Sequence, residues 1–140
     1  MPSLLQIVYT SRATELPQVQ AITATATRNN ARDGINGLLV CDRSRYLQVL
    51  EGPRAVVAAC LGRILVDERH TNVEVTVRRA ISTFNFHDFS VTCNVNEQMD
   101  RRRYMDLIKV HTRNLEDPAL RAMFIGFGFM AALRRDGRTD

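Results

Sequence analysis

The sequence lacks any segment suited to a membrane. Among its 140 residues, no apolar run approaches the ~20 residues that a transmembrane helix needs. The apolar residues between positions 4 and 8 form too short a run for a signal peptide, and no basic region precedes them. We therefore expect a cytoplasmic protein, and the length predicts one compact unit with a hydrophobic core.

Cysteine is also scarce. Cys41, Cys60 and Cys93 are far apart, odd in number and set in apolar segments. A disulfide framework typically shows an even number of cysteines in a short secreted chain. We therefore expect reduced, buried thiols.

The common catalytic motifs are absent as well. The chain has no phosphate-binding loop, no glycine-rich dinucleotide fingerprint, no paired-cysteine motif and no recognisable arrangement of serine, histidine and acid. His70, His87 and His111 have no cysteine or acidic partner at the spacing of metal ligands. The sequence predicts neither an enzyme nor a metal site.

The charge distribution gives little reason to expect nucleic-acid binding. The chain carries 19 Lys and Arg against 15 Asp and Glu, a formal net charge of +4. Clustered cations bind nucleic acid by releasing the counterions of its phosphates. The arginines here are scattered, with concentrations only at residues 101–103 and at Arg134, Arg135 and Arg138. A solvated basic face is the commoner explanation.

Hydrophobic periodicity predicts the fold class. Short aliphatic and aromatic segments predict strands at residues 4–10, 34–40, 46–50, 73–80 and 89–93. A polar turn joins the second and third of these, which indicates a hairpin. With a helix after the first strand and another after the third, the order predicts an α+β, ferredoxin-like sandwich with a mixed five-stranded sheet.

The two helices between the strands are defined by their apolar faces. The first face carries Leu16, Val19, Ile22 and Ala26. This spacing predicts a helix from about residue 14, with Pro17 in its first turn, that ends at Asn29 and Asn30. The second helix follows the break at Gly52 and Pro53, and its face carries Val57, Leu61, Ile64 and Leu65.

The last third of the chain predicts two more helices, packed elsewhere than the first two. The face of the first carries Tyr104, Leu107, Ile108 and His111. The second begins with Asp117 as N-cap and Pro118 as its first residue. Because residues 123–130 are apolar nearly all round, this helix must cover the open face of the sheet, contact another subunit, or both.

Apolar side chains of the last helix also bear on assembly and domain organisation. Phe124, Phe127 and Met130 lead us to expect a homo-oligomer, at least a dimer. We expect residues 1–95 to form the main domain and residues 96–140 a helical extension of the same compact unit.

Two polar residues interrupt the apolar strands. Tyr9 follows Ile7 and Val8, and Gln48 lies between Leu47 and Val49. A buried glutamine needs partners for its amide, since an unpaired buried polar group costs about 1–3 kcal/mol. Periodicity alone leaves two other possibilities open, namely that Gln48 faces solvent or bonds a neighbouring strand.

Several stretches together resemble one family. They read IVYTSR at 7–12, RNNA at 28–31, GINGLL at 34–39, LQVLEGP at 47–53 and DERH at 67–70. Over residues 3–93, in unbroken order, the chain resembles the BLUF family of blue-light sensors using FAD. Several motifs at consistent spacing are more specific than any one alone.

The resemblance implies a non-covalently bound flavin, FAD or else FMN, between the first two helices and the sheet. The positions it assigns to the flavin are Tyr9, Ile22, Asn29, Asn30, Gln48, Leu50, Arg63, Asp67, Arg69 and His70. Ile22 and Leu50 would clamp the ring, and Asn30 would bond its O4 and N3 edge. The last four could instead be a solvated cluster at a helix end.

The resemblance also implies a photoswitch rather than an enzyme. Tyr9 would give an electron and a proton to the excited flavin, and Gln48 would be left rotated or tautomerised. The signal would leave through the last strand, at Phe89 and Val91, and the C-terminal helices, to a separate effector protein. The chain departs from the family where Phe89 and Val91, on either side of a matching Ser90, replace the usual Trp and Met, and where Asn36 replaces Thr.

Three other functions fit parts of the sequence. A ferredoxin-like interaction module without a cofactor would explain Phe89, Val91 and the apolar last helix, but not the joint presence of Tyr9, Asn30 and Gln48. A small phosphate-transferring enzyme could hold an oxyanion with Arg12 and Asn36. Nucleic-acid binding through the arginine-rich tail is the third.

Overall fold

The computed structural model describes residues 3–95 and 99–135, with side chains described through residue 131. The elements are β1 (Leu4–Ala13), α1 (Val19–Asp33), β2 (Asn36–Cys41), β3 (Arg45–Pro53), α2 (Arg54–Leu65), β4 (His70–Ile81), β5 (Phe89–Cys93), α3 (Arg101–Thr112) and α4 (Pro118–Arg135). The predicted order of strands and helices is confirmed.

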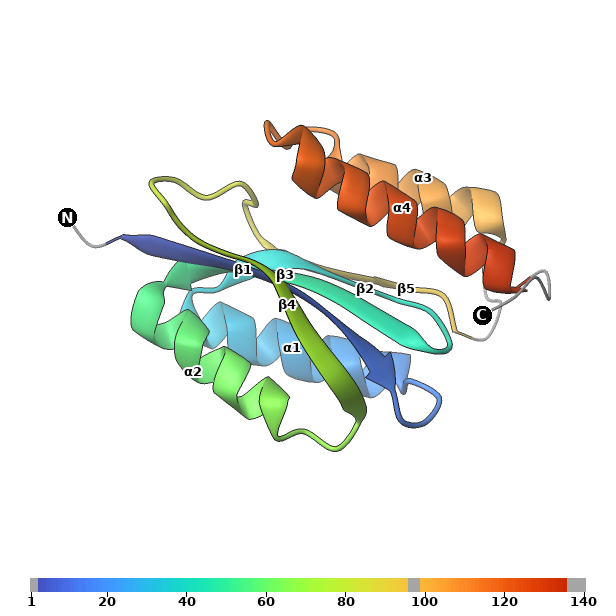
Figure 1. The fold of residues 1–140 in the computed structure, drawn as a ribbon, viewed down its shortest axis with the longest axis horizontal. Coiled ribbons are helices and arrows are strands. Elements are labelled where there is room, and N and C mark those ends of the chain that lie inside the picture. Colours follow the sequence, from blue (N-terminus) through green and yellow to red (C-terminus); the bar gives the residue numbers. More distant parts are fainter. Residues whose placement is uncertain (1–2, 96–98, 136–140) are drawn as a thin grey trace.

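The five strands form one mixed sheet in the order β4-β1-β3-β2-β5. The β2–β5 pairing is parallel, and the β1–β3, β1–β4 and β2–β3 pairings are antiparallel. Helices α1 and α2 cover one face of the sheet, and α3 and α4 cover the other (Figure 1). This is the predicted ferredoxin-like sandwich, and the expected hairpin is formed by β2 and β3.

The predicted bounds of α1 were wrong at both ends. Strand β1 continues to Ala13, and the following turn is tied down by Thr14, whose amide donates to the Arg69 carbonyl at 3.1 Å. Pro17 therefore precedes the helix. At the other end α1 continues to Asp33 and stops at Gly34, which has φ +71° and donates its N–H to the Asn30 carbonyl. The two asparagines thus lie inside the helix.

In α2 the predicted apolar face is correct except at its end. Val57 is fully buried, whereas Leu65 is 56% exposed and was wrongly placed on the core face. In β2, Gly37 has φ +154°, and a side chain there would collide with the Val49 carbonyl oxygen. Glycine is required at this position because β2 and β3 approach so closely.

The expectation of three free thiols was also wrong. Cys41 and Cys93 form a disulfide, and Cys60 is a buried free thiol. The parallel register of β2 and β5 places Cys41 directly opposite Cys93, with 4.5 Å between their Cα atoms. Their sequence separation of 52 residues hides this pairing.

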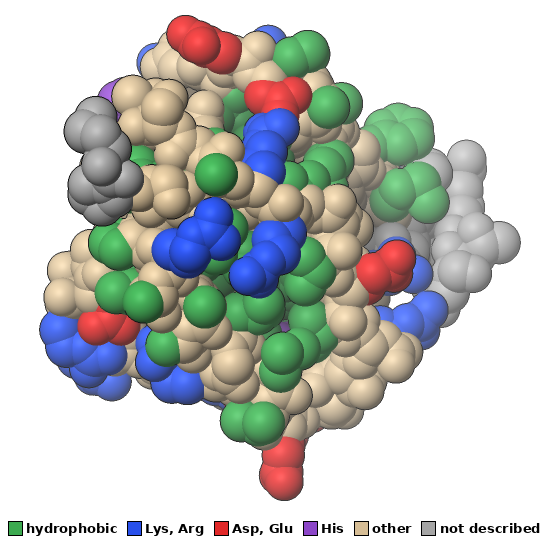
Figure 2. All heavy atoms as spheres, turned by 60° about the vertical axis from the view of Figure 1, so that its left-hand side comes forward, with side chains coloured by type: hydrophobic (Ala, Val, Ile, Leu, Met, Phe, Trp, Pro, Cys, Tyr) green, Lys and Arg blue, Asp and Glu red, His purple; other side chains and the backbone are tan. Residues whose placement is uncertain are grey.

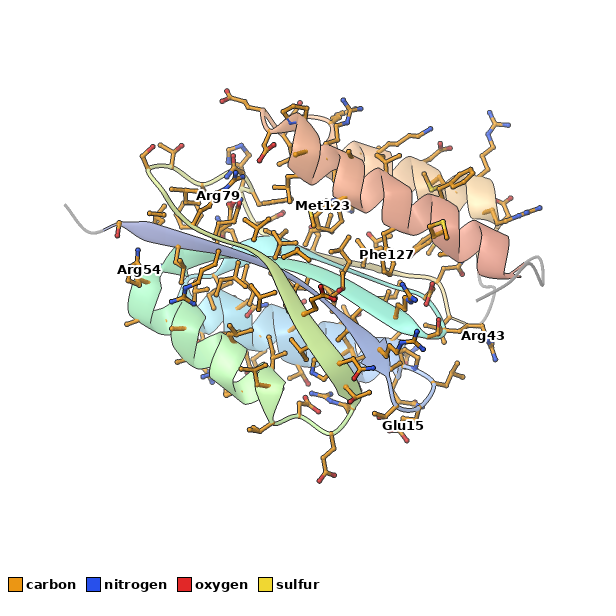
Figure 3. The ribbon with its side chains drawn as sticks, viewed as in Figure 1. Glu15, Arg43, Arg54, Arg79, Met123 and Phe127 are labelled. Carbon is orange, nitrogen blue, oxygen red and sulfur yellow. A yellow bond between two sulfur atoms is a disulfide. The ribbon has the colours of Figure 1, made fainter. Side chains whose placement is uncertain are left out.

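Helices α3 and α4 pack on the face of the sheet that α1 and α2 leave open. The Asp117 Oδ1 atom accepts from the Ala119 N–H at 2.9 Å, which confirms the predicted N-cap of α4. The core on this face includes Val8, Val49, Tyr104, Ile108, Leu120 and Phe124. Met123 and Phe127 extend from α4 toward the sheet (Figure 3).

The apolar last helix therefore uses most of its apolar side chains within the chain. Phe124 is fully buried against the sheet, and Phe127 is partly buried there. Phe129 and Met130 remain 59% and 49% exposed. Of the residues on which the expected oligomer was based, Phe124 is buried, Phe127 is partly buried and Met130 is exposed.

Lys and Arg side chains do not form one continuous patch on the face that Figure 2 presents. Lys and Arg side chains there are dispersed among hydrophobic and polar ones (Figure 2). Residues 101–103 are exposed at the start of α3. Arg138 and the side chains of Arg134 and Arg135 lie outside the described part.

Candidate functional site

Four residues from four strands form a row across the sheet. Tyr9 of β1 pairs with Gln48 of β3, Gln48 pairs with Leu39 of β2, and Leu39 pairs with Val91 of β5. Residues paired across strands point to the same face of a sheet. This row therefore runs from the centre of the sheet to its β5 edge, below α1 and α2.

The centre of the row is a hydrogen bond between Gln48 and Tyr9. Gln48 Nε2 donates to Tyr9 Oη at 2.7 Å. The two residues are only 6% and 3% exposed. Burial raises the pKa of Tyr9 far above its ordinary value, so the phenol holds its proton throughout the physiological range.

A cavity of about 300 Å³ lies over this row, between the sheet and the two helices. Its lining residues are Tyr9, Ile22, Thr25, Ala26, Asn29, Asn30, Leu39, Tyr46, Gln48, Cys60, Arg63, Ile64, Asp67, Arg69 and His70. A volume of this size is at the lower end of the range typical of small-molecule sites, about 300–1,000 Å³.

The cavity combines apolar walls with a few polar groups. Ile22, Leu39 and Ile64 supply apolar surface, while Asn29 and Asn30 present side-chain amides from α1. Asn30 is only 5% exposed, and no side-chain hydrogen bond joins it to another residue in the described part of the chain. Because Asn30 lines the cavity, its amide can bond a ligand with a polar edge. The lining therefore fits a ligand that is largely apolar and has a polar edge.

At the rim of the cavity, charged side chains are already paired. Arg69 Nη2 lies 2.6 Å from Asp67 Oδ2, and this partner holds the pKa of Asp67 below its usual range. Arg63 Nη2 lies 3.4 Å from Asp33 Oδ2. These exposed pairs contribute little to stability, so either arginine can turn to a ligand at small cost.

His70 closes one end of the cavity as a neutral ring. Its Nε2 lies 2.9 Å from the Ile64 carbonyl oxygen, which can only accept, so Nε2 carries the proton. Nδ1 then accepts from the Ser11 hydroxyl at 2.8 Å. Burial lowers the pKa of His70, which favours this neutral form. The ring stands edge-on to Tyr46, with centroids 5.6 Å apart.

The positions assigned to the flavin from sequence therefore surround one cavity, with one exception. All of them except Leu50 line it. Leu50 is fully buried beside the cavity, in a cluster that includes Ile7, Val57 and Cys60.

Sequence reasoning missed six of the lining residues: Thr25, Ala26, Leu39, Tyr46, Cys60 and Ile64. Spacing from the predicted residues could have indicated some of them. Ala26 lies one helical turn after Ile22, and Tyr46 lies two residues before Gln48 on the same strand face.

Two residues of β5 stand where the family usually has Trp and Met. Val91 pairs with Leu39, a wall of the cavity. Phe89 pairs with Gly37, so its ring has no facing side chain on β2. Both are partly buried against the cluster that holds Ile22, Cys41 and Tyr46. The side chains that join the row to β5 are therefore aliphatic and aromatic, while the backbones of β2 and β5 are hydrogen-bonded as parallel strands.

The alternative anion site is not assembled. Arg12 pairs with Arg45 and Asn36 pairs with Glu51, at opposite ends of β3. The Asn36 amide donates to the Phe86 carbonyl at 2.9 Å.

Within residues 3–95 and 99–131, no group of His, Cys, Asp and Glu could hold a metal ion. No helix in the described part is long and apolar enough to span a membrane.

The family comparison agrees with this geometry. Residues 4–92 match the family described as "BLUF: Sensors of blue-light using FAD". The chain belongs to the BLUF family. As a BLUF domain it is a flavin-binding sensor of blue light, and such a unit is a sensory module rather than an enzyme in itself.

Relatives of this BLUF chain include much longer proteins. It is 39% identical over 74 residues to the photoactivated adenylate cyclase subunit beta of Euglena gracilis, which covers 51% of this chain and 9% of that protein. The corresponding subunit of Euglena longa is 38% identical over 81 residues, or 56% of this chain and 9% of that one. The chain thus spans less than a tenth of these relatives.

Solved structures with a similar fold include a BLUF unit. The BLUF unit of BlrP1 has a TM-score of 0.70 and 22% identity, and the match covers 96% of this chain and 92% of that one. A bacterial light-regulated adenylyl cyclase has a TM-score of 0.62 and 27% identity, and the match covers 79% of this chain and 34% of that one.

Proposed function

We propose that this chain is a cytoplasmic BLUF photoreceptor that holds FAD in the cavity and signals through a hydrogen-bond switch at Gln48. The observation that carries the proposal is the buried Gln48–Tyr9 hydrogen bond at the floor of that cavity. The chain itself performs no catalysis in this proposal. Its output is a change in the contacts that it makes with a separate effector protein.

The residues around the cavity can hold the flavin in a defined orientation. Ile22 and Leu39 would sandwich the ring from α1 and the sheet, and the Asn30 amide would bond its polar edge. Arg63 and Arg69 lie at the rim, where a ribityl chain or phosphates would leave. When bound, the flavin supplies blue-light absorption and an excited state that accepts an electron.

Tyr9 and Gln48 perform the switch. Tyr9 would give up an electron and the proton at Oη and would recover both before the switched state is complete, so no residue is oxidised overall. Gln48 now donates to that atom through Nε2. Half a turn of the amide brings Oε1 to the same place, where it accepts from the Tyr9 hydroxyl instead. Both orientations satisfy the phenol, and each hydrogen bond is worth only about 1 kcal/mol net, so the two states lie close in free energy.

The signal then travels along the row. Gln48 contacts β2 at Leu39, and Leu39 contacts β5 at Val91. Strand β5 lies at the edge of the sheet and leads to α3 and α4. In this proposal residues 96–140 extend the flavin-binding domain of residues 1–95 and present the change to a separate effector protein.

An absorption spectrum tests the proposal. The purified protein, reconstituted with FAD, should show flavin bands that shift reversibly to longer wavelength under blue light. Flavin released by denaturation and separated by chromatography decides between FAD and FMN. A protein that stays colourless after reconstitution would overturn the proposal and favour an interaction module without a cofactor.

We also propose that the chain forms a homo-oligomer through the exposed end of α4. Phe129 and Met130 are neighbouring apolar side chains on the surface of this helix. Analytical ultracentrifugation should show at least a dimer at micromolar concentration, and Met130→Glu should weaken it. A strictly monomeric wild-type protein would contradict this assembly.

A further inference from the structure

The Cys41–Cys93 disulfide lies at the end of the strand that carries the output. Cys41 is the last residue of β2, and Cys93 is the last residue of β5. In the described sheet β5 pairs with β2 alone. The disulfide therefore fixes the end of an edge strand that is otherwise held only by hydrogen bonds and packing.

Cys41 is also the point where the segments after β5 attach to the sheet. Its carbonyl oxygen accepts from the Asn94 N–H at 3.0 Å and from the Tyr104 hydroxyl at 2.8 Å. Asn94 follows β5 directly, and Tyr104 belongs to α3. Cys41 thus bonds to β5 through its sulfur. Through its carbonyl oxygen it bonds to the residue after β5 and to α3.

The disulfide is in contact with the cavity walls as well. Cys41 and Cys93 belong to one apolar cluster with Ile22, Leu39 and Tyr46. Those three residues line the cavity. Because protein interiors are close-packed, a change in the distance between Cys41 and Cys93 must be accommodated by the cavity walls.

We propose that Cys41–Cys93 is a reversible redox site that gates the light signal, with the disulfide holding β5 in its dark position. The gating rests on the proposed function. The chemical partners are low-molecular-weight thiols and their disulfides. Reduction frees the end of β5, so the same switch at Gln48 moves β5 further.

The exchange chemistry uses two thiols of the reductant. A thiolate attacks Sγ of Cys93, which is 8% exposed against none for Cys41. The Cys41–Cys93 bond breaks and its electron pair leaves on Cys41, which takes a proton from solvent. A second thiolate attacks the mixed disulfide, releases Cys93 and forms the oxidised disulfide of the reductant. Two electrons pass to the protein, and the reverse exchange restores the clamp.

Thiol counting tests the redox site without reference to flavin or light. After alkylation in denaturant, the oxidised chain should show one reactive thiol, Cys60, and the reduced chain should show all three cysteines. Reduction should also lower the melting temperature by roughly 5–15 °C, since it opens the loop that the disulfide closes between cysteines 52 residues apart. Three reactive thiols after treatment with oxidised glutathione would overturn the site.

The photocycle tests the gating. In the flavin-loaded protein, dithiothreitol should slow the dark recovery of the red-shifted state about fivefold, equivalent to ~1 kcal/mol in the barrier. The Cys41→Ser/Cys93→Ser variant should recover at the slow rate in either condition. Cys60→Ala should keep the difference between the two conditions. If the thiol counts are as expected but recovery is equally fast with and without dithiothreitol, the gating is overturned. If the protein does not bind flavin, the proposed function is overturned, and the thiol count alone decides whether the redox site exists.

Discussion

The two faces of the sheet each bury a glutamine, and the two are held in opposite ways. Gln48 lies below α1 and α2, beside the cavity, and Gln6 lies on the side of α3 and α4. Gln6 is fully buried. Its Nε2 donates to Glu51 Oε2 at 2.6 Å, and its Oε1 accepts from Arg79 Nε at 2.7 Å. Both ends of this amide are therefore fixed.

The partners of Gln6 are fixed in turn. Glu51 is fully buried and also accepts from the Asn85 and Phe86 backbone amides, at 2.7 and 3.1 Å. Arg79 pairs through Nη2 with Asp117, the N-cap of α4, and lies near the start of that helix (Figure 3). Rotation of the Gln6 amide would set donor against donor at Arg79 and acceptor against acceptor at Glu51.

Gln48 has no such constraint. In the described part of the chain its one side-chain hydrogen bond is to Tyr9, whose hydroxyl can donate or accept. Comparison of the two shows what a switchable amide requires: a partner of either hydrogen-bonding sense, and a cavity beside it. The same residue type is a structural clamp on one face and a candidate switch on the other.

The largest expected effect separates the two glutamines. Gln48→Leu should keep the flavin but abolish the light-induced red shift, because leucine has no amide to reorient. Gln6→Leu is the matched control and should keep the shift, while its stability falls because Glu51 and Arg79 lose a partner. Absorption spectra before and after blue light check both. A normal shift in Gln48→Leu would erase the distinction between the two residues.

Glu51 should be the most important residue of the fixed network for stability. Glu51→Ala leaves several buried donors without an acceptor, so we expect the free energy of unfolding to fall by about 3 kcal/mol. Urea denaturation measures this loss. Glu74→Ala, at an exposed position of β4, is the control and should stay within ~0.5 kcal/mol of wild type. Equal effects of the two substitutions would show that the network is not a clamp.

Asp117 tests how far the clamp extends into α4. Asp117→Ala removes the N-cap and the partner of Arg79, which should cost about 1–2 kcal/mol of unfolding free energy. Asp117→Asn keeps a capping oxygen and should cost less than half as much. If both variants unfold at the same denaturant concentration as wild type, α4 is not anchored through this residue.

The smallest expected effect is the pH dependence contributed by His70. Burial lowers its pKa in the folded state, so the unfolded chain binds the proton more readily. Its contribution to stability is present above the unfolded pKa of about 6.5 and is lost as pH falls from there through the folded pKa. Thermal unfolding between pH 7.5 and 5 should show a decline that is shallower in His70→Asn. If stability falls with pH equally steeply in His70→Asn and in wild type, a group other than His70 is responsible for the decline.

The sequence was sufficient for the elements whose signals are local. Alternation of apolar residues located the five strands, and the Asp117–Pro118 pair located the start of α4. The bounds of α1 were wrong because a turn stabilised by Arg69 delays its start and Gly34, rather than the asparagines, ends it. The Thr14–Arg69 contact joins residues distant in the sequence, which periodicity does not report, whereas the Gly34 C-cap bonds Asn30 four residues away and is a local signal that was overlooked.

The cavity was predicted in part for the same reason. Tyr9, Asn30 and Gln48 belong to recognisable motifs, whereas Leu39 and Tyr46 become site residues only once the strand register is known. The Cys41–Cys93 pairing depends on the parallel β2–β5 contact, and no local pattern indicates it. The Gln6–Glu51 bond needs the β1–β3 register in the same way.

The proposed function depends on an exchange, driven by light, between two orientations of the Gln48 amide beside Tyr9. Light-minus-dark infrared difference spectroscopy on protein labelled with ¹³C at the glutamine side-chain carbonyl tests it most directly. A labelled amide band should shift on illumination and return in the dark. It should persist in Gln6→Leu and disappear in Gln48→Leu. A red-shifted flavin spectrum without any change in the labelled amide bands would contradict it.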